Sequence, residues 1–342
     1  MNPGLAATVK QFNLPGFLPH VSYPNRLRWK FAPRLTCLLG VVLHMAPVGG
    51  WSHPIDMPIT QQVNAWIAGF EADQQSKITL EFQDPERYRF RLIPGLRQGV
   101  RLDLLNDEQR HQLRVILRTV VSEAGANKVD SIIATEAALG VIENATDYRD
   151  PGKYWTTVFG APREDAWGIR FEGHHLSVNL TFEGNRLISA TPLFLGANPE
   201  TVPSGPDAGL RALEQEVDLG WAVYQSLDES QRGTARGAEE WFAGFLTSAG
   251  ERRANLGKPA GIATDALNDS QQQALKRLIG TYVETITPAY TAGYLKNAFR
   301  EEWPYLRFYW RGADEPGDAY YYRIAGKRLL IEHENRSGGT HI

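Results

Sequence analysis

The chain has 342 residues, of which 42% are apolar and 22% are charged. This is the composition of a folded globular protein, and it excludes disordered and collagen-like classes. Lys and Arg (36) against Asp and Glu (39) leave a net charge of −3, which argues against a nucleic-acid-binding surface. The single cysteine cannot form an internal disulfide, and a chain of this length can bury a core without one.

Residues 1–50 combine the three parts of a secretory signal. They carry a charge of +5 with no acidic residue, whereas the remainder of the chain carries −8. An apolar run of about 12 residues, 35–46, follows the basic stretch and leads into small residues. The run is too short to span a bilayer, which takes about 20 residues. We therefore predict an export leader at 1–50, a periplasmic or secreted protein, and one α+β domain at 51–342; the alternative is a buried N-terminal helix.

Helical periodicity of apolar residues recurs along the domain. It predicts helices at residues 106–123, 128–142, 207–227, 268–286 and 288–300. Asn106, Asp228 and Asn268 are each followed three positions later by Gln. A short polar residue with Gln three residues on is typical of a capping box, so we expect helices to begin at these three positions.

Strand signals gather in two stretches. Trp167–Ala190 predicts a hairpin that turns at Gly184-Asn185, and Tyr320–Asn335 predicts one that turns at Gly326-Lys327. Both stretches follow helical segments, so they are either copies of a duplicated unit or two unrelated hairpins. The predicted fold class is α+β: an antiparallel sheet built from the two hairpin units, with helices packed on it.

A change of phase in the apolar pattern marks the most informative stretch. Apolar side chains occupy odd positions before Gly173 and even positions after His175. Because strand residues alternate between faces, one extra residue at Gly173-His174-His175 would restore the pattern, so we predict a β-bulge there. The bulge would gather polar side chains on one face of the sheet: Arg170, Glu172, a histidine, Ser177 and Asn179.

These histidines suggest a metal site. Neutral imidazole is the commonest metal ligand, and two histidines are adjacent at 174–175. If both hairpins share one sheet, Glu332 and His341 near the C-terminus could approach them. We predict a divalent transition metal (Zn, Cu or Fe) held by His174, His175, His341 and Glu332. The alternative is a hydrogen-bonded histidine pair with a structural role.

The function predicted from these residues is an exported metal-dependent enzyme acting on a small molecule. Glu172 would serve as general base or as a partner of a metal-bound histidine, and Arg170 would orient an anionic substrate group. A histidine-rich ligand set favours redox chemistry slightly over hydrolysis. The alternative is a non-catalytic ligand-binding or cell-envelope domain that uses the aromatic stretches Trp303–Trp310 and Tyr320–Tyr322, which otherwise pack as strands. The substrate and the oligomeric state stay open.

Several consecutive motifs carry a family resemblance. They are Arg149–Tyr154, Phe159–Pro162, Trp167-Gly168, Gly173–Asn179 and Pro192–Pro199. Through them the chain, from about Trp66 onward, resembles the bacterial domain-of-unknown-function 3500 family. The resemblance implies an export signal and a C-terminal tail containing His-Ile-His. This sequence stops at His341-Ile342, one residue before the second of those histidines, so we expect either a clipped C-terminus or a site without that residue.

Overall fold

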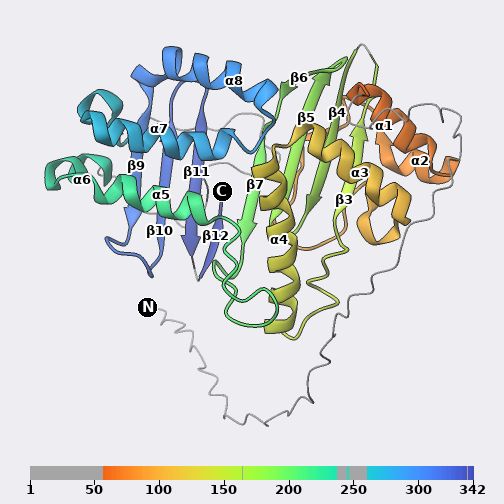
Figure 1. Cartoon of the computed structure of the whole chain (residues 1–342), viewed down its shortest axis with the longest axis horizontal. Coiled ribbons are helices and arrows are strands. Elements are labelled where there is room, and N and C mark those ends of the chain that lie inside the picture. The colour runs from red at the N-terminus through yellow and green to blue at the C-terminus, as the bar shows by residue number, and fades with distance from the viewer. Residues whose placement is uncertain (1–56, 164, 237–244, 246–259, 337) are drawn as a thin grey trace, which may run out of the picture. The chain divides into compact units, whose positions relative to one another are not determined.

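The computed structural model describes residues 57–163, 165–236, 245, 260–336 and 338–342. Within these residues a 12-stranded, mostly antiparallel sheet carries helices on one face (Figure 1). The predicted α+β fold class is confirmed, and both predicted hairpins lie in this one sheet. The export leader predicted for residues 1–50 lies outside the described residues.

The strands follow one another across the sheet in the order β1-β3-β4-β5-β7-β12-β11-β10-β9-β8, with β2 beside β3 and β6 beside β5. Their bounds in the first half are β1 Thr79–Leu80, β2 Val100–Arg101, β3 Trp155–Phe159, β4 Ala166–Gly173, β5 Leu176–Glu183, β6 Arg186–Ser189 and β7 Leu193–Ala197. The second half comprises β8 Ile262–Ala263, β9 Arg307–Gly312, β10 Tyr320–Ala325, β11 Leu330–Arg336 and β12 Gly339–His341. The two halves of the sheet pair through β7 and β12.

Three of the helices, α3, α6 and α7, begin directly after the predicted caps. The helices are α1 Ile59–Ala68, α2 Ala72–Ile78, α3 Asp107–Val120, α4 Glu123–Ile142, α5 Glu214–Gln225, α6 Glu229–Arg236, α7 Asp269–Val283 and α8 Pro288–Asn297, with short 3₁₀ or π turns at 85–88, 102–104, 264–266, 298–302 and 303–305. The side chains of Asn106, Asp228 and Asn268 each accept a hydrogen bond from the backbone N–H three residues on. The three predicted caps are therefore confirmed.

The order of elements in residues 59–183 recurs in residues 214–336. Each stretch has two helices, a short strand leading into a 3₁₀ turn, a helix with a capping box, a further helix and three antiparallel strands. The first stretch adds β1 and the turn at 85–88, and the second adds the turns at 298–305. This recurrence favours the duplicated-unit interpretation. In this alignment the β10–β11 turn at Gly326-Lys327 corresponds to the β4–β5 turn. It does not correspond to the turn at Gly184-Asn185, which joins β5 to β6 and which the duplicated-unit interpretation of the sequence had paired with it.

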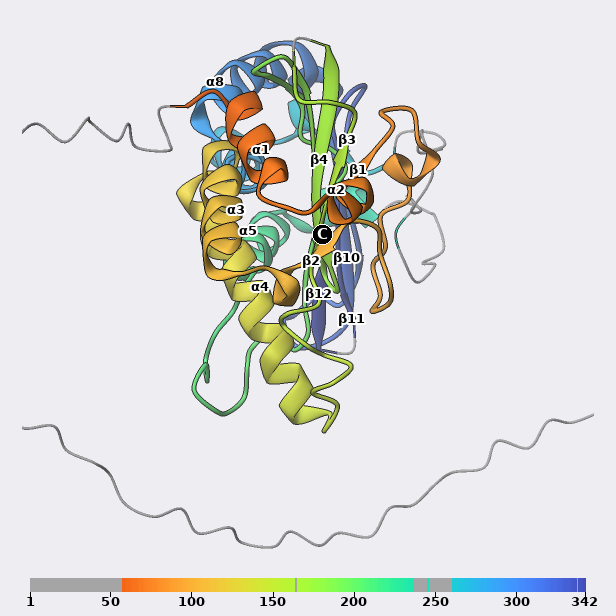
Figure 2. The ribbon, with the colours of Figure 1, turned by 90° about the vertical axis from the view of Figure 1, so that its right-hand side faces the viewer.

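Each half of the sheet has its own core beneath the helices. The first core lies between α1, α3, α4 and strands β3–β5, and the second between α5–α7 and strands β8–β11. In the second core the ring of Trp310 stacks between those of Tyr224 and Tyr320, with centroid distances of 4.2 and 5.0 Å. These rings are buried, so this part of the predicted aromatic surface is core packing. The segment 81–99 lies on the opposite face of the sheet from the helices (Figure 2).

A buried ion pair ties the helix layers of the two halves together. Lys128 on α4 places its Nζ 2.5 Å from Oε1 of Glu216 on α5, and the two side chains are 11% and 0% exposed. The same Nζ donates to the backbone carbonyl of Thr281 on α7, at 2.8 Å. One ammonium group therefore fixes α4 against α5 and α7.

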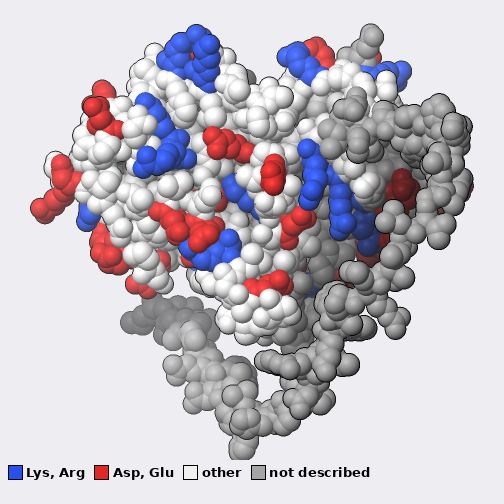
Figure 3. All heavy atoms as spheres, viewed as in Figure 1, with Lys and Arg blue, Asp and Glu red and all other residues white. Residues whose placement is uncertain are grey.

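On the face shown in Figure 3, acidic and basic side chains are interspersed rather than segregated. This arrangement agrees with the small net charge of the chain. Among the described residues, no helix combines the length and the apolar character that crossing a membrane requires.

Candidate metal centre

His174 and His175 form the tight turn that joins β4 to β5. The two strands pair as far as Gly173 and Leu176, so exactly two residues make the reversal, and His175 adopts a positive φ of 60°. The predicted β-bulge is therefore wrong. Across a two-residue turn, odd-numbered residues pair with even-numbered ones, as Phe171 does with Val178. The turn therefore explains why apolar residues change from odd to even positions, which we had assigned to a bulge.

A glutamate from the helix layer meets this turn. Oε2 of Glu136, on α4, lies 2.6 Å from Nδ1 of His174 and 3.7 Å from Nδ1 of His175. Ligand atoms of the three residues all lie within 4.8 Å of one another. The three side chains are 2%, 11% and 7% exposed, so this is a buried group.

Sequence reasoning missed Glu136, although a signal was present. Glu136 follows Val129 by seven positions and Ile132 by four, and it precedes Leu139 by three. It therefore stands on the apolar stripe of the predicted helix, where a carboxylate requires a partner. A charged residue in that stripe is the pattern that points to a buried site.

The residue before the histidine pair must be a glycine. A Cβ on Gly173 would lie 2.2 Å from the ring of Tyr154, which is closer than atoms can approach. The Tyr154 hydroxyl donates to the backbone carbonyl of His174 at 3.2 Å, and its ring stacks on Phe171. Tyr154 therefore fixes the backbone of the turn from inside the core.

His341 lies beside the pair, at the junction of the two sheet halves. Its ring centroid is 5.0 Å from that of His175, and β12 places it opposite Gly196 of β7. A Cβ on Gly196 would lie 2.9 Å from the His341 ring and 3.2 Å from the His175 ring. The missing side chain at position 196 thus leaves the space in which the two imidazoles approach each other.

Burial controls the protonation of these imidazoles. It lowers the pKa of His175 far below its ordinary value, and the nearby His174, His341 and Arg149 lower it further. Burial, followed by the effect of His174, lowers the pKa of His341 to about 4. Both rings are neutral at pH 7, which is the form that binds metals.

The sequence matches the family described as protein of unknown function (DUF3500) over residues 54–342. The chain belongs to this family. The matched range contains Glu136, both turn histidines and His341. No curated protein and no solved structure matches the chain.

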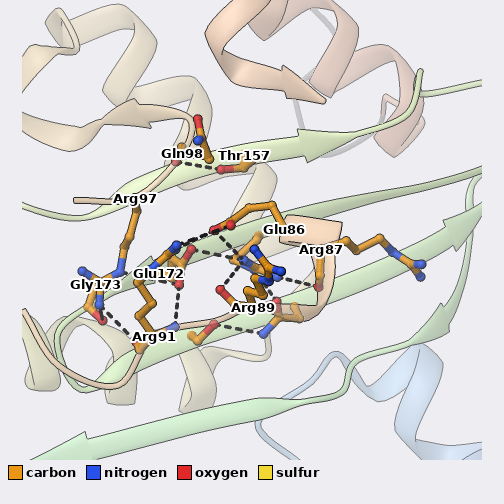
Figure 4. A network of polar contacts seen from close by, with 12 residues as sticks. Glu86, Arg87, Arg89, Arg91, Arg97, Gln98, Thr157, Glu172 and Gly173 are labelled. Carbon is orange, nitrogen blue, oxygen red and sulfur yellow. Dashed lines mark hydrogen bonds and ion pairs between the residues drawn. The ribbon is translucent and has the colours of Figure 1, made fainter. Parts of the chain in front are cut away.

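In this DUF3500 chain the two residues predicted to be catalytic, Glu172 and Arg170, belong to a buried ionic network, in which Figure 4 shows Glu172 near Arg91 and Arg97. They flank Phe171, which packs in the core beneath the helices, so strand alternation places them on the other face of the sheet. Glu172 is 3.5 Å from Nε of Arg97 and 3.3 Å from Nη1 of Arg170, and it accepts a hydrogen bond from the backbone N–H of Arg91. Arg170 also donates to the side chain of Asn179 at 2.6 Å. The group formed by Glu136 and the two turn histidines does not include Glu172, and the catalytic role of Glu172 and Arg170 stays a prediction.

Arg97 connects this network to the histidine turn. Its guanidinium donates to four backbone carbonyls, those of Arg91, Ile93, Gly95 and Gly173. Gly173 immediately precedes the histidine pair, so Arg97 holds the segment 91–97 against the end of β4. The network thereby fixes the turn from the side opposite α4.

Glu332 lies apart from the three-residue group as well. It accepts a hydrogen bond from the Tyr321 hydroxyl at 2.8 Å and lines a cavity of about 900 Å³, as does Arg170. Leu92, Phe194 and Ile342 line the same cavity. Leu92 accepts from the His175 backbone N–H, and the Phe194 ring stacks on His341, so the cavity adjoins the histidines without being lined by them. Of the predicted site residues, His174 and His175 therefore lie in the turn with His341 beside them, Arg170 and Glu332 line the cavity, and Glu172 lies in the ionic network.

Proposed function

We propose that this DUF3500 protein is a metal-dependent enzyme whose divalent transition metal is held by Glu136, His174 and His175. The observation that carries the proposal is the approach of three buried ligand atoms, one from each residue, to within 4.8 Å of one another. Donors about 2.1 Å from a shared ion lie no more than about 4.2 Å apart, so small side-chain shifts suffice to bind one. His341 lies close enough to His175 to be a further donor or to support the ring.

The donor set indicates which chemistry such an ion would supply. Two imidazoles and one carboxylate leave coordination positions open, and this set serves Fe(II) in oxygenases and Zn in hydrolases. The third imidazole beside the set makes the site histidine-rich. We therefore favour redox chemistry over hydrolysis, with copper or iron as the ion.

The chain's own residues hold these donors in place. The Glu136 carboxylate fixes the orientation of the His174 ring through the 2.6 Å contact at Nδ1. Tyr154 and Arg97 hold the backbone on either side of the histidine pair. In this proposal Glu172 and Arg170 act through Arg97 and the turn, as positioning residues.

Metal content tests the proposal. The protein, purified without a histidine tag, is loaded with Zn²⁺, Cu²⁺ or Fe²⁺, dialysed and analysed by mass spectrometry. We expect about one equivalent in the wild type and in His111→Ala, which removes an exposed histidine on α3. Glu136→Gln and the double variant His174→Ala/His175→Ala should retain less than a tenth of it.

The same preparations separate a metal site from a structural histidine pair. If the histidines are ligands, a chelator lowers the melting temperature of the metal-loaded wild type, because a bound ion stabilises the folded state. A wild type that holds no metal and ignores chelator, beside a strongly destabilised double variant, would refute the metal site. The polar groups of the turn would then be structural.

We propose in addition that residues 1–50 direct export. The charge contrast between this segment and the remaining chain, together with the short apolar run, supports this. N-terminal sequencing of the protein from the periplasm or medium of an export-competent bacterial host should find a start near residue 50. A mature protein that still begins at Met1 in that compartment would contradict the proposal.

A further inference from the structure

A permanent cation lies directly against the candidate metal ligands. Nη1 of Arg149 is 3.1 Å from Nδ1 and 3.2 Å from Nε2 of His174. The Arg149 side chain is 14% exposed, and its Nε and Nη2 donate to the two carboxylate oxygens of Glu143 at 2.7 and 3.2 Å. A Cβ on Gly140 of α4 would lie 3.0 Å from the backbone oxygen of Arg149. The backbone of Arg149 therefore packs closely on this glycine, which fixes the position from which its side chain extends.

Charge balance indicates what this cation is for. A guanidinium stays protonated at all physiological pH values, so Arg149 opposes the binding of a second cation beside it. With neutral histidines and one divalent ion, the charges of Glu136, Glu143 and Arg149 leave the site at +1. Glu143 is 37% exposed, so solvent weakens its compensation. An uncompensated charge in a buried site is costly, and one monoanion removes it.

The neighbouring ionic network adds to the positive potential. On the other side of the turn, Glu86 and Glu172 face the three guanidinium groups of Arg91, Arg97 and Arg170. This network also sums to +1. Two adjoining clusters of the same sign attract an anion to the end of the β4–β5 hairpin.

Exposed apolar side chains flank the same turn. Ile93 is 70% exposed and Leu96 is 85% exposed, on the segment that Arg97 ties to Gly173. On the α4 side, Val141 is 72% exposed, and Tyr148, directly before Arg149, is 56% exposed. Single exposed apolar residues are ordinary, but here two lie on each side of one cationic turn, and an apolar body can lie against the pair on the side of Arg149.

We propose that the substrate of this site is a carboxylic acid with an apolar body, whose carboxylate is bound by Arg149. Glu143 occupies the Nε–Nη2 edge of the Arg149 guanidinium, so the substrate carboxylate is bound by the other edge, between Nη1 and Nη2. One carboxylate balances a charge of +1. The apolar body lies along the exposed side chains on the Arg149 side of the turn. This inference rests on the proposed metal site, because the charge to be balanced includes the ion.

The test uses cobalt as the ion and octanoate as the probe, with full-length protein. Cobalt(II) absorbs visible light in a way that depends on its ligands, so no enzyme activity is needed. We expect octanoate to change the spectrum of the cobalt-loaded wild type saturably. Acetate, which lacks the apolar body, and 1-octanol, which lacks the charge, should each bind at least tenfold more weakly.

Variants of Arg149 give the decisive comparison. Arg149→Met should weaken octanoate binding 10- to 100-fold, as expected for loss of a charge-assisted pair of hydrogen bonds, and should bind cobalt more tightly than the wild type. Arg149→Lys, which keeps the charge without the fork, should be intermediate. Arg186→Met removes an arginine that pairs with Glu183 at the far end of β5, and it should behave as the wild type.

Each outcome decides between the two proposals. A wild type that binds cobalt but shows no spectral response to octanoate overturns this inference and leaves the metal site standing. Equal octanoate affinity in the wild type and in folded Arg149→Met or Arg149→Lys also overturns it, as does 1-octanol binding as tightly as octanoate. A wild type that binds no cobalt refutes the metal site and this inference together.

Discussion

Replacing Lys128 by Met tests how firmly α4 is held against the second half of the domain. The substitution keeps most of the side-chain volume but leaves the Glu216 carboxylate, which is 0% exposed, without its 2.5 Å partner. Removing one member of a buried ion pair costs about 3–5 kcal/mol, because the remaining charge is uncompensated. The melting temperature should therefore fall by roughly 10 °C.

The double variant Lys128→Met/Glu216→Leu provides the internal control. With both charges removed, stability should return to within about 1 kcal/mol of the wild type, since the desolvation cost disappears with the pair. Lys77→Met breaks an exposed pair with Asp73, in which the side chains are 71% and 74% exposed, and should change stability by less than about 0.5 kcal/mol. Urea unfolding measures all four proteins. A loss below about 1 kcal/mol in Lys128→Met, or a double variant that is as unstable as Lys128→Met, would refute the reasoning.

Two further predictions concern histidines. Burial lowers the pKa of the fully enclosed His333 to about 3. Between pH 6.5 and 3 the unfolded chain therefore binds a proton that the folded chain does not, and the free energy of unfolding decreases as the pH is lowered. On going from pH 7 to 4.5, the wild type should lose about 2–3 kcal/mol more than His333→Gln in urea unfolding, and equal losses would contradict this. Gly196→Ala places a Cβ 2.9 Å from the His341 ring and should weaken metal binding about tenfold with little loss of stability. Calorimetric titration with Zn²⁺ checks it against Gly233→Ala, where a Cβ meets no atom within 4 Å; unchanged affinity in Gly196→Ala would show that the ring packing is irrelevant.

Local signals in the sequence account for much of the fold. Asn106 and Asn268 cap α3 and α7 as their Gln partners predict, because a capping box is satisfied within four residues. The turn at Gly184-Asn185 likewise joins β5 to β6, as its short-range chemistry requires. Helix α5, in contrast, begins at Glu214, seven residues after the predicted start, since no comparable cap marks its beginning.

The site was harder to predict because its parts come from separate elements. The adjacent histidines identified one end of the site, and the chain brought His341 beside them through pairing of β12 with β7. Glu136 reaches them from a helix, at a distance of 38 residues along the chain. No local pattern fixes which face of a sheet a helix will cover, so the partner of a buried carboxylate cannot be named before the packing is known.

The central claim is that Glu136 and the histidine turn bind one metal ion. X-ray absorption spectroscopy of the zinc-loaded protein tests it most directly, because the first shell reports the number and kind of ligands. The account predicts two or three imidazole nitrogens at about 2.0–2.1 Å with one carboxylate oxygen at about 2.0–2.2 Å. A first shell of oxygen ligands alone, or a wild-type spectrum without imidazole scattering, would contradict the claim.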